Sequence, residues 1–324
     1  MNKTAPTSSF VVPNKFLRKE SSNGIHSISN SRYGVQTAEE RGMPEHESPT
    51  GTETQALQKL KDLFDAPVSG VAQEIAPADE MFDDNREHYF GVGQSALRMV
   101  KLALLASGKA PGDVKQVLDL PSGHGRVLRV LRAAFPGAQL TACDLLRDGV
   151  DYCSREFGAR PVYSQDPIDA VSLETRFDLI WCGSLLTHLD APRWDDFLAY
   201  FVAHLNPGGL LLFTVHGASV LQRLKSGWNY GLDVEGMRRL TAGMQKAGFG
   251  YVDYPNNQGY GISIAERDWT LKRLAQHREL RVLAYCDRGW DDHQDVIACS
   301  RDTWAAPPGP AAETHATLDL GLET

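Results

Sequence analysis

Residues 117–126, Val-Leu-Asp-Leu-Pro-Ser-Gly-His-Gly-Arg, constrain the fold of this chain more than any other stretch of its sequence. The apolar start of the run predicts a short buried strand, and the amphipathic residues from Val127 to Phe135 predict a helix. Between them lies a tight loop with Gly123 and Gly125, whose lack of a Cβ lets the backbone approach a ligand closely. A strand, a glycine loop and a helix in this order begin a nucleotide-type cofactor site.

A second apolar run, Ala138 to Cys143, ends in an acid, Asp144, roughly twenty residues after the loop. In nucleotide sites of this kind, an acid at that spacing accepts hydrogen bonds from the ribose hydroxyls. We therefore expect Asp144 to lie at the nucleoside end of the same site.

The spacing of small residues in the loop indicates whether the site suits a dinucleotide or a nucleoside cofactor. A dinucleotide fingerprint needs a third small residue after Gly123 and Gly125, at position 128, so that helix and strand pack closely. This chain has Leu128 there, and Pro121 stands just before the loop. The sequence therefore favours a nucleoside cofactor without a diphosphate.

The composition is that of an ordinary globular protein, and it argues against several partner classes. The 324 residues carry a formal net charge of -8, which disfavours long-range attraction to nucleic acid or to an anionic membrane. No apolar run reaches the roughly 20 residues needed to cross a bilayer, and Met1–Glu20 lacks the apolar core of a secretory signal. The five cysteines lack C-x-x-C spacing, so we expect reduced thiols in a cytoplasmic protein and no bound metal.

Composition and periodicity divide the chain into four parts. The two ends are rich in small and polar residues and are expected to be disordered, whereas the middle shows the pattern of a packed domain. The expected parts are a disordered N-terminal segment (1–53), a linker with a short helix at Ala56–Phe64 (54–80), the cofactor-binding domain (81–301) and a disordered tail (302–324).

Strands and helices alternate within the domain, which predicts a doubly wound α/β fold with a mostly parallel sheet and helices on both faces. A helix at Gly93–Ser107 precedes the first strand. The last two strands are joined by a short turn containing Arg288–Trp290 and should pair antiparallel. The seven predicted strands are Gln116–Leu120, Ala138–Asp144, Arg160–Tyr163, Phe177–Cys182, Leu210–Val215, Leu280–Cys286 and Val296–Cys299.

The stretch 217–279 is longer than a single crossover connection requires. It contains predicted helices at Val234–Ala247 and Arg267–His277, with a Tyr/Gly/Asn-rich stretch, Tyr251–Ile264, between them. Its position after a strand end suits a substrate lid, and an additional packing layer is an equally open interpretation.

The run 117–126 resembles motif I of the class I S-adenosylmethionine-dependent methyltransferases, in the variant D-x-P-x-G-x-G-R. Pro121 replaces the first glycine of the commoner pattern. The resemblance extends over about Tyr89 to Arg301, and it is strengthened by Asp144, by Phe-Asp-Leu-Ile at 177–180 and by Asn-Pro-Gly-Gly at 206–209. It implies a Rossmann-like, seven-stranded sheet with an antiparallel C-terminal hairpin.

The resemblance also implies S-adenosylmethionine as the cofactor. Its methionine part would lie against Asp119 and the glycine loop, its ribose against Asp144, and its adenine amino group against Gln165 or Asp166. The residues that follow the strand Phe177–Cys182 would line the methyl side. The implied cofactor-binding residues are Asp119, Gly123, His124, Gly125, Arg126, Asp144, Leu145, Gln165, Asp166, Gly183 and Ser184.

Some side chains around the loop allow two interpretations. His124 is either a cofactor contact or a residue that tolerates exposure, and Asp119 could cap the helix turn without a ligand. Arg126, Arg129 and Arg132 recur at every third residue, which predicts a solvated helix face, with Arg126 close to the loop.

Transfer of a methyl group to a hydroxyl requires a group that takes the hydroxyl proton, and histidine is the usual one. His188 follows the fourth strand and His216 ends the fifth, and we favour these two as the general base. His293, before the last strand, is a third candidate. A metal-assisted mechanism through His188 and Asp190 is disfavoured because no dense His and carboxylate cluster appears.

The sequence thus predicts a methyltransferase that acts on a small-molecule or saccharide-like acceptor at a hydroxyl oxygen, with no nucleic acid or membrane partner. An NAD(P)-dependent oxidoreductase is the first alternative, and Leu128 argues against it. A non-catalytic S-adenosylmethionine-binding or scaffold protein is the second. The sequence Cys-Gly-Ser-Leu at 182–185 differs from the N/D-P-P-Y/F signature of amino-directed enzymes. The acceptor's identity and the oligomeric state stay open.

Overall fold

A computed structural model describes residue 64 and residues 66–302 of the chain. The predicted helix at Ala56–Phe64 and the predicted disordered segments 1–53 and 302–324 lie outside the described residues, apart from Phe64 and Asp302. Among the described residues, no helix is both long and apolar enough to cross a membrane.

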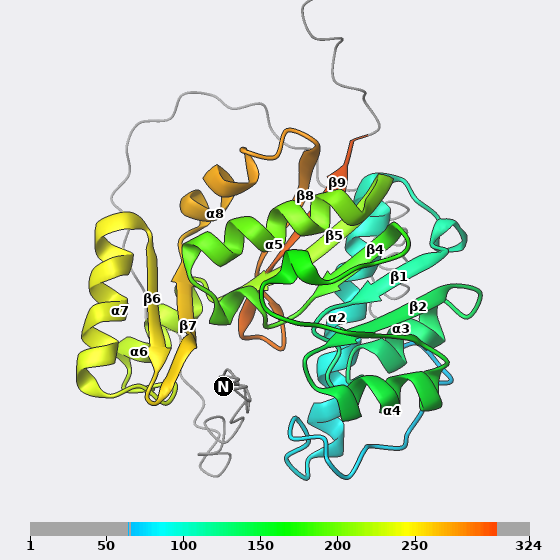
Figure 1. The fold of residues 1–324 in the computed structure, drawn as a ribbon, viewed down its shortest axis with the longest axis horizontal. Helices are drawn as coiled ribbons and strands as arrows, with labels where there is room; N and C mark the ends of the chain where they lie inside the picture. The colour runs from blue at the N-terminus through cyan, green and yellow to red at the C-terminus, as the bar shows by residue number, and fades with distance from the viewer. Residues whose placement is uncertain (1–63, 65, 303–324) are drawn as a thin grey trace, which may run out of the picture.

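Seven strands form one twisted sheet in the order β3-β2-β1-β4-β5-β9-β8 (Figure 1). The first five strands run parallel, and β9 is antiparallel to both β5 and β8. The Rossmann-like, mostly parallel sheet with an antiparallel C-terminal hairpin is therefore confirmed. The strands are β1 (Gln116–Asp119), β2 (Gln139–Asp144), β3 (Arg160–Tyr163), β4 (Phe177–Cys182), β5 (Leu205–Val215), β8 (Leu280–Trp290) and β9 (Gln294–Arg301).

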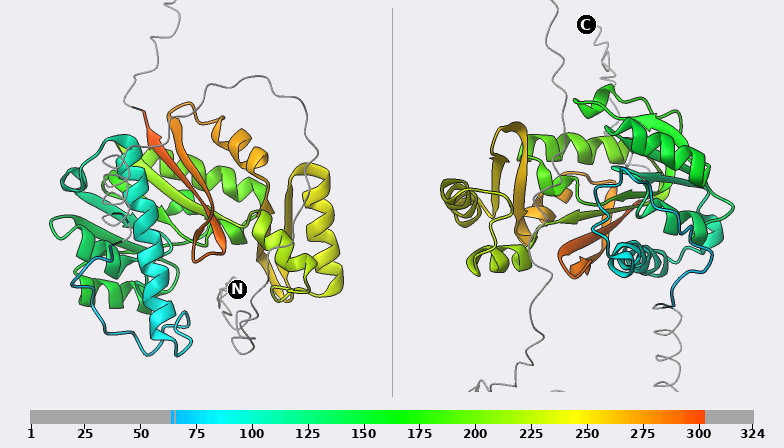
Figure 2. Two further views of the ribbon diagram at one scale, coloured as in Figure 1. Left: turned by 180° about the vertical axis from the view of Figure 1, so that it is seen from behind. Right: turned by 90° about the horizontal axis from the view of Figure 1, so that it is seen from below.

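Helices cover both faces of the sheet, so the central strands are buried on both sides and read as continuous apolar runs. On β1, Val117 faces one apolar core and Leu118 faces the other. The first core packs against α2, which crosses that face of the sheet (Figure 2), and against α3 and α4. The second packs against α5 and α8. These helices are α2 (Arg86–Ser107), α3 (Leu128–Ala134), α4 (Arg147–Phe157), α5 (Ala191–His204) and α8 (Arg267–Leu274).

Several element boundaries differ from the sequence-based expectation. Strand β5 begins at Leu205 and not at Leu210, so the Asn-Pro-Gly-Gly residues at 206–209 belong to the strand, and β9 spans Gln294–Arg301 and extends beyond Val296–Cys299 at both ends. Helix α2 begins at Arg86, two turns before Gly93, because the Asn85 side chain caps it by accepting from the His88 N–H. Helix α8 ends at Leu274 and does not reach His277. Strand β8 continues to Trp290, so the residues expected in the hairpin turn belong to the strand.

The actual turn between β8 and β9 is formed by Asp291, Asp292 and His293. Asp291 and Asp292 have positive φ angles, 54° and 51°, and the His293 N–H donates to the Trp290 carbonyl over 3.1 Å. Because Trp290 pairs with Gln294, the connection has three residues, and its first two have the left-handed backbone that is common in hairpin turns.

The insertion, residues 217–279, builds a small unit of its own at one end of the sheet (Figure 1). It contains α6 (Ala218–Lys225), α7 (Val234–Ala247) and an antiparallel hairpin of β6 (Phe249–Tyr254) and β7 (Asn257–Ala265), followed by α8. The hairpin occupies the Tyr/Gly/Asn-rich stretch, for which the sequence predicted no element, and α6 was also missed. The unit has a separate apolar core, made by Val220, Leu224, Leu232, Leu240, Met244, Val252, Ile262 and Ile264.

Arg129 corrects the expectation of a solvated arginine face on α3. Its side chain is only 1% exposed and donates to three backbone carbonyls, those of Gly125, Ala72 and Glu74. The guanidinium has enough donors to bind all three at once, so it fastens the segment before α2 to the helix that follows the glycine loop.

Candidate functional site

The carboxyl ends of the parallel strands meet along one edge of the sheet. Asp119 at the end of β1 pairs in register with Ala142 of β2 and Trp181 of β4, and Cys182 of β4 pairs with Phe213 of β5. The strand-end residues that the sequence singled out therefore lie along one edge, where ligands bind in open α/β sheets.

The two glycines of the loop serve different purposes. Both have positive φ angles, 50° at Gly123 and 82° at Gly125. A Cβ on Gly125 would lie 2.4 Å from a ring carbon of Phe157 and 3.0 Å from the Cys153 sulfur, whereas a Cβ on Gly123 would meet no atom within 4 Å. Gly125 is thus required for packing, and Gly123 leaves open space at the edge of the sheet.

Asp144 is 7% exposed and fixes the loop from the end of β2. One carboxylate oxygen accepts from the Gly123 N–H over 2.7 Å, and the other accepts from the Leu146 N–H over 2.9 Å. Burial raises the pKa of this carboxyl above its usual range. Each oxygen keeps lone-pair capacity for a further donor, so Asp144 is able to bind ligand hydroxyls while it holds the loop.

Asp119 is almost fully buried, and neither of its carboxyl oxygens has a hydrogen bond of good geometry among the described residues, although the Leu128 N–H at the start of α3 acts on the carboxyl and lowers its pKa slightly. Burial, and secondarily the charge of Asp144, raise its pKa well above the usual range. The Ser122 hydroxyl in the loop is also buried, and Cys153 is the one described side chain that acts on it. Buried polar groups left without good hydrogen bonds are costly, so these acceptors fit a ligand that brings hydrogen-bond donors to this edge.

The remaining residues assigned to the nucleoside end differ in exposure. Leu145 is 47% exposed. Gln165 and Asp166 are also exposed, and the Gln165 amide donates to the Ala170 carbonyl and borders a hollow of about 400 Å³. His124 is buried, with its Nε2 atom 3.4 Å from a carboxylate oxygen of Asp148, so it is not an exposed loop residue.

The end of β4 is contacted by side chains from three other strands, β5, β8 and β9. Ser184 has a positive φ of 57°, and its N–H donates to the Thr214 hydroxyl over 2.7 Å. The Gln294 amide donates to the Ser184 hydroxyl over 3.1 Å, and a Cβ on Gly183 would lie 3.0 Å from the Trp290 ring. Sequence reasoning missed Trp290 and Gln294 as site residues. The one sequence signal that could have identified them is their position at the turn of the predicted C-terminal hairpin, which pairs antiparallel to β5.

His188 and His216 lie near one another, with ring centroids 6.2 Å apart. The Nδ1 atom of His188 lies 2.8 Å from the Gly261 carbonyl oxygen, and that of His216 lies 3.2 Å from the Ser263 carbonyl oxygen. A carbonyl only accepts, so each Nδ1 carries the proton and each neutral ring keeps its lone pair on Nε2. Burial lowers the pKa of His188 to about 4 and that of His216 well below the usual value.

Rings from the insertion close over these histidines. Tyr260 of β7 stacks on His188 at 4.9 Å. Tyr230, between α6 and α7, lies parallel to His293, and its hydroxyl is 3.0 Å from the His293 Nε2 atom. His293 in turn stacks on His216 at 5.5 Å. The third candidate histidine therefore belongs to the same cluster, and its Nε2 atom is already bound.

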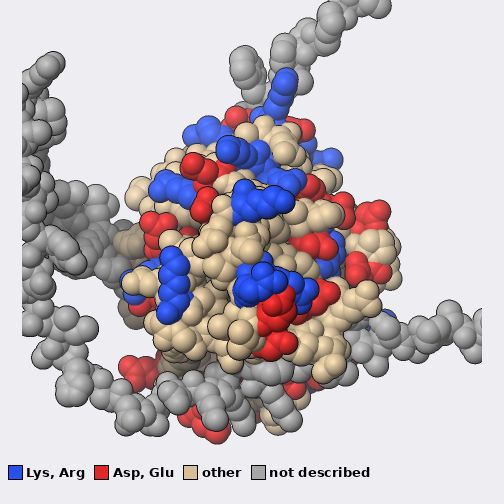
Figure 3. Space-filling view, turned by 90° about the vertical axis from the view of Figure 1, so that its left-hand side faces the viewer, with Lys and Arg blue, Asp and Glu red and all other residues tan. Residues whose placement is uncertain are grey.

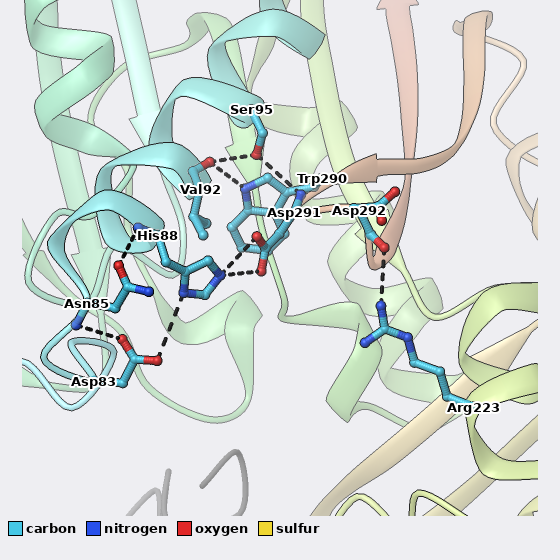
Figure 4. Close-up of polar contacts among 9 residues, drawn as sticks. All are labelled: Asp83, Asn85, His88, Val92, Ser95, Arg223, Trp290, Asp291 and Asp292. Carbon is cyan, nitrogen blue, oxygen red and sulfur yellow. Dashed lines mark hydrogen bonds and ion pairs between the residues drawn. The ribbon is translucent and has the colours of Figure 1, made fainter. Parts of the chain in front are cut away.

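The turn between β8 and β9 joins two parts of the site (Figure 4). On one side, the His88 Nε2 atom of α2 lies 3.1 Å from both carboxylate oxygens of Asp291, and the Trp290 indole donates to the Val92 carbonyl. On the other side, the Arg223 guanidinium of α6 donates to the Asp292 carbonyl over 3.3 Å. The turn thus bonds to the helix before the sheet and to the insertion.

Charges on the face that carries α7 are mixed (Figure 3). Lys and Arg side chains lie there among Asp and Glu side chains, as in the ion pair of Arg238 with Glu235 at 2.6 Å. Such a face lacks the continuous basic stripe of a nucleic-acid footprint. Within residues 64 and 66–302, no group of three or more His, Cys, Asp or Glu side chains is arranged to hold a metal ion.

Comparisons with known proteins agree with this geometry. Residues 118–211 match a family described as a methyltransferase domain. A fatty-acid O-methyltransferase from Mycolicibacterium smegmatis is 32% identical over 122 residues, 36% of this chain and 44% of the relative. A malonyl-[acyl-carrier protein] O-methyltransferase from Anoxybacillus flavithermus is 26% identical over 120 residues, 37% of this chain and 46% of the relative. The chain thus spans less than half the length of these curated relatives.

Among solved structures, DesVI from Streptomyces venezuelae superposes with a TM-score of 0.48 and 15% identity, over 71% of this chain and 99% of that chain.

Proposed function

We propose that this chain, whose residues 118–211 match a methyltransferase-domain family, transfers a methyl group from S-adenosylmethionine to a hydroxyl oxygen of a small-molecule or saccharide-like acceptor. The observation that supports this most is the buried Asp119 carboxyl, which has no hydrogen bond of good geometry among the described residues, beside the open space at Gly123. A cofactor with a ribose, an ammonium group and a positive sulfur supplies the donors and the charge that these acids lack.

The cofactor would be held by the strand ends. Asp144 would bind the ribose hydroxyls, and Asp119 with the glycine loop would face the methionine part. Leu145, Gln165 and Asp166 would border the adenine, and Gly183 and Ser184 the methyl side. His124 and Arg126 would complete the set from the loop. When bound, the cofactor supplies a methyl group on an already activated sulfonium, so the enzyme's main task is alignment.

The general base in this proposal is the Nε2 atom of His188 or of His216. Both rings have Nδ1 committed to a backbone carbonyl, which fixes their orientation and leaves the Nε2 lone pair for a hydroxyl proton. Because burial lowers their pKa values, both rings are neutral at pH 7 and hold that lone pair ready. The neutral rings of Tyr230 and Tyr260 nearby support an acceptor whose reacting end is uncharged.

An NAD(P)-dependent oxidoreductase receives no support. Leu128, at the position where a dinucleotide loop needs a small residue, is fully buried in the first core. The five cysteines are free, which supports a reducing compartment, and we propose a cytoplasmic location.

Calorimetric titration with S-adenosylmethionine, S-adenosylhomocysteine and NAD⁺ tests the cofactor. We expect micromolar binding of the two sulfur nucleosides, none of NAD⁺, and a loss of about a hundredfold in Asp144→Ala, which removes charge-assisted hydrogen bonds to the ribose. Asp196→Ala, on the exposed side of α5, serves as the matched control and should bind like the parent chain. Binding of NAD⁺ alone would overturn the proposal.

The base is tested with methyl-labelled cofactor and a panel of phenols and methyl glycosides as acceptors. Replacement of the true base by alanine should lower turnover by about 100-fold or more while S-adenosylhomocysteine still binds with parental affinity. Full turnover in both His188→Ala and His216→Ala would sink the assignment. Cofactor binding without turnover on any acceptor would favour a non-catalytic binding role.

A further inference from the structure

The insertion contains a cavity of about 470 Å³ between the first turn of α7 and the turn that joins β6 to β7. These elements lie side by side (Figure 1). The volume is within the range of small-ligand sites, roughly 300–1,000 Å³. Leu232 and Val252 give the cavity a buried apolar surface that also belongs to the core of the insertion. Of the described residues that line it, none belongs to the set assigned to the cofactor.

The rest of the lining is largely polar, and it presents hydrogen-bond donors and acceptors together. Asn257 is half-buried and Gln258 is exposed, and neither side-chain amide is hydrogen-bonded to a described residue. Asp253 accepts from the Tyr251 hydroxyl and from the Gly259 N–H through the same oxygen, Oδ1, so its Oδ2 atom keeps its capacity. Each amide offers two N–H donors and a carbonyl acceptor, so a ligand in the cavity meets both kinds of group.

The charges at the cavity are of both signs, and each is partly engaged by the protein. Asp233 caps α7 by accepting from the Gly236 N–H over 2.6 Å, and the Arg239 charge acts on the Glu235 carboxylate. A site for a phosphate or for a cation would concentrate charge of one sign. A hydroxyl both donates and accepts, so a neutral ligand with several hydroxyls complements this lining, whereas a fatty acyl chain would leave its amides unsatisfied.

Tyr254 connects the cavity to one of the two candidate bases. It lines the cavity, and its hydroxyl lies 3.3 Å from the His188 Nδ1 atom. Tyr260, whose ring centroid is 5.6 Å from that of Tyr254, stacks on His188. His216 instead contacts Tyr230, which is not among the described residues that line the cavity. The cavity therefore adjoins the His188 side of the histidine cluster.

We propose that this cavity is the specificity subsite for the acceptor and binds a neutral sugar ring that carries the reacting hydroxyl or is linked to it. The inference rests on the proposed function and narrows its acceptor class to a glycoside. A simple phenol has a single hydroxyl and would leave most of the polar groups of the cavity to water. A sugar ring provides several hydroxyls for the amides and Asp253, and C–H groups for Leu232 and Val252.

The test measures binding of sugars to the full chain saturated with S-adenosylhomocysteine. The probes are neutral methyl hexopyranosides of the gluco, galacto, manno and rhamno series, with phenol, methyl glucuronoside and methyl glucosaminide for comparison. We expect a neutral glycoside to bind about tenfold tighter than any of these three, and Asn257→Ala and Gln258→Ala each to weaken it about three- to tenfold. Gln245→Ala, on an exposed part of α7 outside the cavity, is the matched control and should leave the affinity unchanged.

Two further measurements separate recognition from folding. All variants should bind S-adenosylhomocysteine within about twofold of the parent chain, and Gln258→Glu, which keeps the size and an acceptor, should recover part of the glycoside affinity. If no neutral glycoside binds better than the three comparison ligands, or if both alanine variants bind it like the parent, the inference is wrong and the proposed function stands. A parent chain that does not bind S-adenosylhomocysteine refutes the proposed function, even where the free protein binds glycosides.

Discussion

The edge of the sheet at β1 and β2 and the insertion that covers the ends of β4 and β5 are built on different principles. At β1 and β2, Asp144 binds the backbone N–H groups of Gly123 and Leu146, so the loop shape is fixed by main-chain hydrogen bonds. Over β4 and β5, side-chain rings such as Tyr260 and Tyr230 contact the histidines. Main-chain geometry restricts residue type at each position, whereas ring packing accepts many combinations.

Under the proposed function, this difference lies between the part of the site that would hold the cofactor and the part that would hold the acceptor. The core of the insertion is also separate from the two cores of the sheet. We therefore expect substitutions in the loop to affect the whole domain and substitutions in the insertion to act locally.

The largest effect is expected from Gly125→Ala. The new Cβ would overlap Phe157 and force an alanine to adopt a φ of 82°, so we expect a loss of about 3 kcal/mol or more in the free energy of unfolding and weaker cofactor binding. Urea denaturation measures the change. Gly137→Ala is the control, because a Cβ there meets nothing within 4 Å, and it should alter stability by less than about 0.5 kcal/mol.

Arg129→Met should cost about 2 kcal/mol, because it removes the donor to the Ala72 carbonyl and one of the two donors to each of the Glu74 and Gly125 carbonyls. We expect limited proteolysis to cleave near residues 72–74 much faster than in the parent chain. Arg155→Met, which removes an exposed arginine, should leave the cleavage rate unchanged. Protection that stays equal in both variants would show that Arg129 does not fasten this segment.

Gly261→Ala should disturb the insertion alone. The added Cβ would lie 2.0 Å from the Val252 carbonyl oxygen on the neighbouring strand, at a local cost of about 2 kcal/mol. Hydrogen exchange should accelerate in β6 and β7 but not in β1, β2 and β4, and S-adenosylhomocysteine affinity should stay within about twofold of the parent. Loss of cofactor binding would break the proposed separation between the two regions.

The acid stability of the protein should depend on His188. Burial holds its pKa at about 4 in the folded protein, against about 6.5 in the unfolded chain. As the pH falls from about 6.5 to about 4, the unfolded state takes up a proton that the folded state does not, so the free energy of unfolding falls. The raised pKa values of Asp119 and Asp144 act in the opposite direction. His188→Asn should therefore lose less stability over this range than the parent chain, and an equal or greater loss would contradict the assignment.

The smallest effect is expected from His88→Ala. This side chain is about half exposed and pairs with Asp291 at the surface, so we expect a change in the free energy of unfolding of less than about 1 kcal/mol that shrinks with added salt. Thermal denaturation at low and high salt measures it. A large, salt-independent loss would mean that the turn depends on this pair for its position.

The parallel sheet, its antiparallel hairpin and the strand-end acids were predictable because each left a local pattern. The run 117–126 shows its strand and loop directly, since apolar residues and glycines have few structural interpretations. The burial of Arg129 was not predictable, because its acceptors are carbonyls some 55 residues earlier in the chain, as at Glu74, and leave no pattern in the sequence. The hairpin β6–β7 was missed because its glycines and tyrosines do not alternate as strand residues usually do.

The candidate site likewise contains residues that a local sequence pattern predicted and residues that it did not. Asp144 was identified by its spacing from the loop, whereas Gln294 was not identified because its role depends on where a distant strand ends. His188 and His216 were predicted because they follow the ends of predicted strands. The carbonyls that orient them belong to β7, a strand that was not predicted from the sequence.

The turn at Asp291, Asp292 and His293 connects two parts of the molecule. It bonds to α2 through His88 and Ser95 and to α6 through Arg223. If the insertion moves outward, the hydrogen bond from Arg223 must break or the turn must move with it. The turn follows Trp290, whose ring lies near both Arg126 and Gly183. The region that would admit an acceptor is thus connected to the region that would hold the cofactor through this one short turn.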